Sequence, residues 1–249
     1  MLIPIGTGVG VTSISLGLVR AIAREGVKVS FFKPVAQPKP SYNGPEASTA
    51  VIKAAAGLDL PEPIAASHME SLMSAGDKST LLEEIIANYE KHAQSSEADV
   101  IVVEGLVPIE KHPFADSINT DIASGIDADI IFVTQPGNGS TTDLRDRLEL
   151  ACNSVSDAIK KRVIGCIINK VGANVDAHGV PTQLEIGVPT ADLKELNLDG
   201  VTKVLATIPW NPQLNAARAS DLATYLGAKV INAGEINTRR LNEVVFCAR

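Results

Sequence analysis

The N-terminal stretch of the chain carries residue types that bind phosphate. A short apolar run at residues 2–5 is followed by a turn rich in glycine and hydroxyl side chains: Gly6, Thr7, Gly8, Gly10, Thr12 and Ser13. In such a turn, backbone N–H groups and the N-terminus of the next helix present unpaired donors to an anion. The order of strand, glycine-rich turn and helix is typical of a phosphate-binding P-loop. We therefore place a candidate nucleotide or metabolite site at residues 6–13.

One position of this loop departs from the P-loop pattern. Val11 stands where the motif has a lysine, directly before Thr12. That lysine places a positive charge at the bridging phosphates, and losing its charge-assisted hydrogen bond costs roughly 1.5–3 kcal/mol. The sequence thus predicts the geometry of a nucleotide site without its main cation, and competent triphosphate binding is not expected.

Three further polar residues end predicted strands, where a parallel sheet presents groups to a ligand. Lys33 either supplies part of the missing charge or is a surface lysine with its stem along apolar neighbours. Glu104 either holds Mg²⁺ together with Thr12, as a weak metal site, or caps a turn. Asn169 either contacts an adenine edge or caps a turn. These alternatives stay open at the level of sequence.

The residue pattern supports neither a nucleophilic catalytic triad nor a zinc site. The four histidines have no Ser or Cys partner pattern nearby, and the three cysteines lack zinc-type spacing: His68, His92, His112, His178, Cys152, Cys166 and Cys247. We predict no catalytic residue and no dedicated metal cluster.

Composition narrows the class of protein. The 249 residues are 45% hydrophobic and carry a net charge of −7, which argues against nucleic acid or an anionic membrane as partner. The sequence contains no apolar run of membrane-spanning length and no signal-peptide pattern. We expect a cytoplasmic protein.

Apolar runs of strand length alternate with helix-like segments along most of the chain. This alternation predicts an α/β fold with a doubly wound, mostly parallel sheet. Strands are expected at 2–5, 27–32, 99–104, 128–134, 163–169, 204–208 and 229–232. Helices are expected at 13–24, 45–56, 79–95, 116–126, 141–154 and 214–226, and residues 172–200 are interpreted as an insertion.

The predicted organisation is one P-loop-like α/β domain at residues 1–233, followed by the start of another module at 234–249. The segment GEINTRRLNEVVFCAR begins after the last predicted strand, and its apolar VVFCAR end suggests a chain that continues.

The motifs IPIGTGVGVTS, FFKPVA, VVEGLVP, VIGCIINKV and ATIPW resemble, in order, the skeleton of the dethiobiotin synthetase-like P-loop family. The resemblance implies that Lys33 contacts substrate or phosphate, Glu104 contacts metal or substrate, and Asn169 contacts adenine. The sequence departs from this family at Val11 and at residues 106–108, which argues against ATP-dependent ligation.

A second resemblance covers almost the whole chain. The segments IPIGTGVGVTSISLGLVRA, FFKPVAQP, EEIIANY, VVEGLVP, GEINTRR and VVFCAR are similar to the N-terminal region of long-form bacterial phosphate acetyltransferases. The resemblance implies that a C-terminal domain outside this chain transfers acetyl groups between acetyl-CoA and phosphate. It also implies a DRTGG-like module from residue 234, and a region associated with oligomer stability and with allosteric response to ATP, NADH or pyruvate.

Three hypotheses follow for function. The first is a non-catalytic regulatory and assembly region with no certain cofactor, whose partners are downstream domains of the same polypeptide, copies of itself and small-molecule effectors. The second is an ATP-dependent ligase in which Lys33 replaces the lost cation. The third is a scaffold without a ligand.

Overall fold

The computed structural model describes residues 1–37, 46–109, 112, 114–137, 139–173, 196, 198–211, 213 and 216–241. The chain divides into two compact units, Met1–Ile208 and Pro209–Arg249. The first carries the candidate site. No helix among the described residues is both long and apolar enough to cross a membrane.

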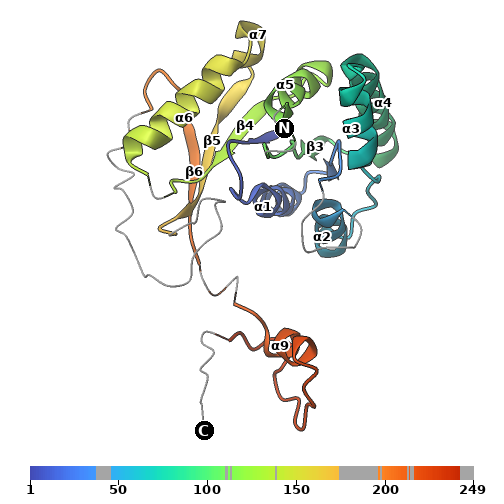
Figure 1. Cartoon of the computed structure of the whole chain (residues 1–249), viewed down its shortest axis with the longest axis vertical. Helices are drawn as coiled ribbons and strands as arrows, with labels where there is room; N and C mark the ends of the chain where they lie inside the picture. Colours follow the sequence, from blue (N-terminus) through green and yellow to red (C-terminus); the bar gives the residue numbers. More distant parts are fainter. Residues whose placement is uncertain are drawn as a thin grey trace. The chain divides into compact units, whose positions relative to one another are not determined.

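The strands form a predominantly parallel sheet (Figure 1). Four of them lie in the order β1 (Leu2–Pro4), β4 (Ile130–Thr134), β5 (Val163–Val171) and β6 (Val204–Pro209). Two more, β2 (Val29–Phe32) and β3 (Val100–Val103), pair in parallel. An isolated parallel bridge links Leu2 of β1 to Glu104, the residue after β3, and the Gly105 N–H donates to the Leu2 carbonyl at 2.9 Å.

Helices connect the strands, as parallel pairing requires. In the first unit they are α1 (Val11–Arg24), α2 (Ala47–Ala56), α3 (Ala66–Ser74), α4 (Lys78–Ser96), α5 (Ala115–Gly125), α6 (Thr141–Ser154) and α7 (Asp157–Lys160). The second unit contains α9 (Ala219–Tyr225).

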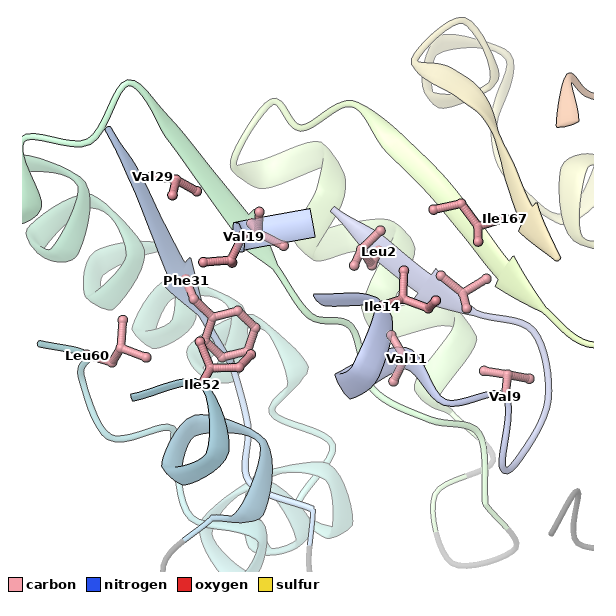
Figure 2. Packing of buried hydrophobic residues seen from close by; sticks show 12 residues of the cluster. Leu2, Val9, Val11, Ile14, Val19, Val29, Phe31, Ile52, Leu60 and Ile167 are labelled. Carbon is pink, nitrogen blue, oxygen red and sulfur yellow. The ribbon is translucent and has the colours of Figure 1, made fainter. Parts of the chain in front are cut away.

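Neighbouring residues of each strand serve opposite faces of the sheet, because side chains alternate along a strand. Leu2 packs with α1 and α2 in one apolar cluster (Figure 2), whereas Ile3 packs with α6 in another. In β2, Phe31 belongs to the cluster that contains Leu2, and Phe32 packs on the opposite face against α4 and α5. Helices therefore cover both faces, which confirms the doubly wound α/β prediction.

Most predicted elements form within a few residues of the expected bounds, with three differences. Helices α3 and α7 were not predicted; α3 buries only Met69 and α7 is four residues long, so neither has a clear apolar periodicity. The strand predicted at 229–232 is wrong, because these residues are exposed and form no strand. Most of the predicted insertion (174–195 and 197) and residues 242–249 lie outside the described residues, and the domain boundary after residue 233 stays a prediction.

Candidate ligand site at the glycine-rich loop

The glycine-rich loop runs from the end of β1 to the first turn of α1. Its three glycines, Gly6, Gly8 and Gly10, have φ of 98°, 66° and 80°, the left-handed region that other residues rarely adopt. Gly10 is the N-cap of α1, and no described side chain caps this helix end. These left-handed glycines let the backbone turn tightly from β1 into α1.

Three successive carbonyls of the loop are held by side chains from the ends of β4 and β5. The amide of Gln135 donates to the Thr7 carbonyl at 3.5 Å, and that of Asn169 donates to the Val9 carbonyl at 2.8 Å. Between them, the Lys170 ammonium donates to the Gly8 carbonyl. These bonds fix the loop from outside.

The contact with Asn169 explains why position 10 is glycine. A Cβ on Gly10 would lie 2.6 Å from the Asn169 amide nitrogen, far inside ordinary contact distance. Asn169 is predicted to contact adenine or to cap a turn. In the structure its amide nitrogen donates to the Val9 carbonyl of the loop. Its side chain is buried at the end of β5.

Val11, at the position of the missing lysine, is part of the core. It is 5% exposed and belongs to the same cluster as Leu2, Ile14 and Ile167. Figure 2 shows it next to Ile14 on the first turn of α1. Position 11, where the P-loop motif has a lysine, is therefore an apolar packing residue in this chain.

Lys33 and Glu104 form a buried ion pair. The Lys33 ammonium lies 3.0 Å from Glu104 Oε1, and the two side chains are 2% and 1% exposed. Lys33 also donates to the Gly105 carbonyl at 3.1 Å. The Lys33 charge is therefore neutralised inside the protein.

Hydroxyl groups complete the shell around the Glu104 carboxylate. Thr12 donates to Oε1 at 3.3 Å, and Ser15 donates to Oε2 at 3.0 Å. The Thr12 hydroxyl is also 2.9 Å from that of Ser48, at the start of α2. Both carboxylate oxygens have protein donors, so a Mg²⁺ ion at Glu104 would have to compete with Lys33.

The segment after Glu104 is held by two side-chain amides. Asn119 of α5 pairs with both the N–H and the carbonyl of Leu106, at 2.7 and 2.8 Å. Gln37 pairs with Val107 in the same way, at 2.7 and 2.9 Å. These bonds fix the backbone that presents Glu104.

The structure brings Thr12, Lys33 and Glu104 together beside the loop, whereas Ser13 is exposed. Six contributors were missed by the sequence reasoning: Ser15, Gln37, Ser48, Asn119, Gln135 and Lys170. Ser15 had a detectable signal, since it lies one helical turn from Thr12 on α1; the others come from separate elements. Among the described residues, no group of three or more His, Cys, Asp or Glu side chains could hold a metal.

A profile of the AAA domain family matches residues 1–218. The chain belongs to the AAA domain family. The match spans the loop, Lys33, Glu104 and Asn169, and the family shares the dethiobiotin synthetase-like P-loop fold. Membership therefore confirms the fold predicted from the motifs.

The chain is also similar to the N-terminal region of curated phosphate acetyltransferases. Identity is 43% over the whole chain with the proteins of Salmonella typhimurium and Escherichia coli, and 40% with that of Haemophilus influenzae. In each case the match covers 36% of the relative. The chain thus spans about a third of the length of these relatives.

Solved structures resemble the chain more distantly. The MinC:MinD cell division protein complex of Aquifex aeolicus matches with a TM-score of 0.47 and 19% identity, covering 86% of this chain and 83% of that one. The signal recognition particle receptor FtsY of Elizabethkingia anophelis, in complex with GDP, matches with a TM-score of 0.46 and 15% identity, covering 77% and 57%.

Proposed function

We propose that this chain is a non-catalytic regulatory and assembly region of a phosphate acetyltransferase. Acetyl transfer between acetyl-CoA and phosphate takes place in a part of the polypeptide outside these 249 residues. The relatives' name and the share of their length that matches support this assignment.

One observation carries the non-catalytic part of the proposal. The lysine of the P-loop motif is absent, because position 11 is a buried valine, and the Lys33 ammonium is paired with Glu104 in the interior. Moving Lys33 to a phosphate would leave a buried carboxylate without its counterion, which is costly. This arrangement supports a loop that does not drive hydrolysis or ligation with ATP.

The regulatory part of the proposal uses the loop as a metabolite site. An anionic effector, with NADH and pyruvate as candidates, binds at the loop near Thr12 and shifts how the region packs against the rest of the polypeptide or against further copies. Such an effector changes activity only if it binds two states of the enzyme unequally. The preformed path of the loop lowers the ordering cost of binding.

Calorimetric titration with MgATP tests this function, with wild type and Val11→Lys side by side. We expect no measurable binding by wild type and a gain of affinity in Val11→Lys; NADH and pyruvate are titrated next. Acetyl phosphate formation by residues 1–249 alone would contradict the proposal. Tight MgATP binding and turnover by wild type would contradict it as well.

The convergence of Thr12, Lys33 and Glu104 supports a second candidate, an ATP-dependent ligase. In that case Lys33 leaves Glu104 when nucleotide binds and supplies the missing charge. Lys33→Ala would then abolish MgATP turnover that wild type performs. Absence of turnover in wild type rejects this candidate.

A further inference from the structure

We infer that Lys170 is a positioning residue of the candidate site: it orients the backbone donors of the glycine-rich loop and supplies positive charge that Val11 does not. The inference rests on the proposed function, because it takes the loop to bind an anionic effector. It deepens that function by naming the residue that gives the loop its charge. It also names the class of effector, a phosphate compound that carries a hydroxyl or amide donor.

Lys170 is one of three side chains that hold successive carbonyls of the loop. Its ammonium donates to the Gly8 carbonyl, between the bonds that Gln135 and Asn169 make to the two neighbouring carbonyls. In a trans peptide the carbonyl and the following N–H point in opposite directions. The three bonds therefore turn the N–H groups of residues 8–10 away from the ends of β4 and β5. These donors continue into the first turn of α1, which has no side-chain cap.

Lys170 contributes charge as well as orientation. An ammonium that is bonded to a carbonyl polarises the peptide group, which makes the N–H on the other side a stronger donor. Lys33 cannot do the same, because its ammonium lies 3.0 Å from the Glu104 carboxylate in the interior. Among the described residues, Lys170 is therefore the cation that contacts the loop backbone.

The backbone of Lys170 has a conformation that lysine rarely adopts. Its φ is 54°, in the left-handed region, although it belongs to the C-terminal end of β5. Side chains alternate along an extended strand, so Asn169 and Lys170 would otherwise point to opposite faces. With the left-handed residue, both reach the loop. Such strained residues persist where the structure fixes them, and they cluster at ligand sites.

A second observation indicates a ligand at the loop. Gln135 is 5% exposed, and its Oε1 atom has no hydrogen-bond partner among the described residues, while its amide nitrogen donates to Thr7. A buried acceptor without a partner is costly, and a hydroxyl or amide of a ligand would satisfy it. A molecule that meets both the loop N–H groups and Gln135 needs negative charge and a separate donor. NADH has both, whereas pyruvate has no hydrogen-bond donor.

Calorimetric titration of residues 1–249 with NADH and with pyruvate tests the inference. We expect wild type to bind NADH about tenfold or more tightly than pyruvate, and Lys170→Met to lose about tenfold or more of the NADH affinity. Lys170→Arg should recover most of this loss, because a guanidinium keeps the charge and the donors. The difference between wild type and Lys170→Met should shrink at high salt, since salt screens an exposed charge.

The matched control is Lys161→Met, at an exposed lysine that precedes the other end of β5. It should bind NADH like wild type, and thermal melting checks that every variant is folded. Wild-type NADH affinity in Lys170→Met would overturn the role of Lys170 and leave the proposed function intact. A loss that Lys170→Arg does not rescue and salt does not change would mean a structural role, and would overturn it too.

The two effectors test the ligand class. Equal affinity of wild type for pyruvate and NADH would overturn the class of effector inferred from Gln135. Absence of binding of both effectors to wild type would overturn the proposed metabolite site, and this inference with it.

Discussion

The two units differ in where they place their apolar and charged side chains. The first unit buries three apolar clusters and even encloses an ion pair, with Lys33 and Glu104 almost fully shielded from water. The second unit exposes Tyr225, Leu226 and Ile231 while its charged residues are also at the surface. The first unit thus has apolar clusters of its own, whereas helix α9 of the second unit buries none of its residues.

This contrast also bears on the candidate site. A nucleotide-hydrolysing loop keeps the motif lysine available to its ligand, whereas here that position is a valine and Lys33 is paired with a buried carboxylate. Val11 adds to the core and Lys33 satisfies Glu104.

The largest effect should come from breaking the buried ion pair. Lys33→Met leaves the Glu104 carboxylate buried without a counterion, and we expect the free energy of unfolding to fall by about 3–5 kcal/mol at pH 7. Urea denaturation measures this. Adding Glu104→Gln to the variant should recover most of the loss, since the amide can still bond Ser15. A loss below about 1 kcal/mol for the single variant would show that the pair is open in solution.

A second large effect should appear at alkaline pH. Burial, and to a lesser extent the neighbouring Cys152, raises the pKa of the Cys166 thiol to about 11. In the unfolded chain the thiol loses its proton near pH 8.5–9. Below that pH the thiol is protonated in both states, and the free energy of unfolding is at its full value. It then falls by about 2–3 kcal/mol as the pH rises to 11. Denaturation curves at pH 8 and pH 10.5 measure this loss. The free energy of unfolding should fall less between the two pH values in Cys166→Ala than in wild type. An equal fall in both proteins would refute the prediction.

An intermediate effect is expected at the glycine-rich loop. Gly10→Ala combines a left-handed backbone with a Cβ that would press on Asn169, and should cost about 2 kcal/mol of unfolding free energy. Gly6→Ala is the matched control, because Gly6 has a φ of 98° but no atom within 4 Å of its Cβ position. It should cost about half as much. Equal losses, measured by thermal melting, would mean that the contact with Asn169 is unimportant.

The smallest effect should come from the second unit. Ile231→Ala in residues 1–249 removes a side chain that is 95% exposed, and should change the free energy of unfolding by less than about 0.5 kcal/mol. The matched change in the first unit is Ile52→Ala, at a fully buried side chain, which should cost about 2–5 kcal/mol. Comparable losses for the two variants would abolish the distinction between the units.

Local patterns predicted much of this architecture. The alternation of apolar runs and helix-like segments indicated the parallel sheet, and the predicted bounds at Thr141–Ser154 match α6. Short elements with little apolar periodicity, α3 and α7, could not be found in this way. The apolar run at 229–232 resembles a strand in sequence, but a strand requires a neighbour to pair with, and the described residues provide none there.

For the candidate site, the sequence by itself determined the glycine-rich turn, the absence of the lysine at position 11 and the placement of Lys33 and Glu104 at strand ends. These follow from residue type and spacing along one chain segment. Only the tertiary structure decided that Lys33 neutralises Glu104 rather than facing a ligand, and that Asn169 bonds the loop. Those outcomes depend on distances between α1, α2, β2, β3 and β5, which sheet packing sets and no local pattern encodes.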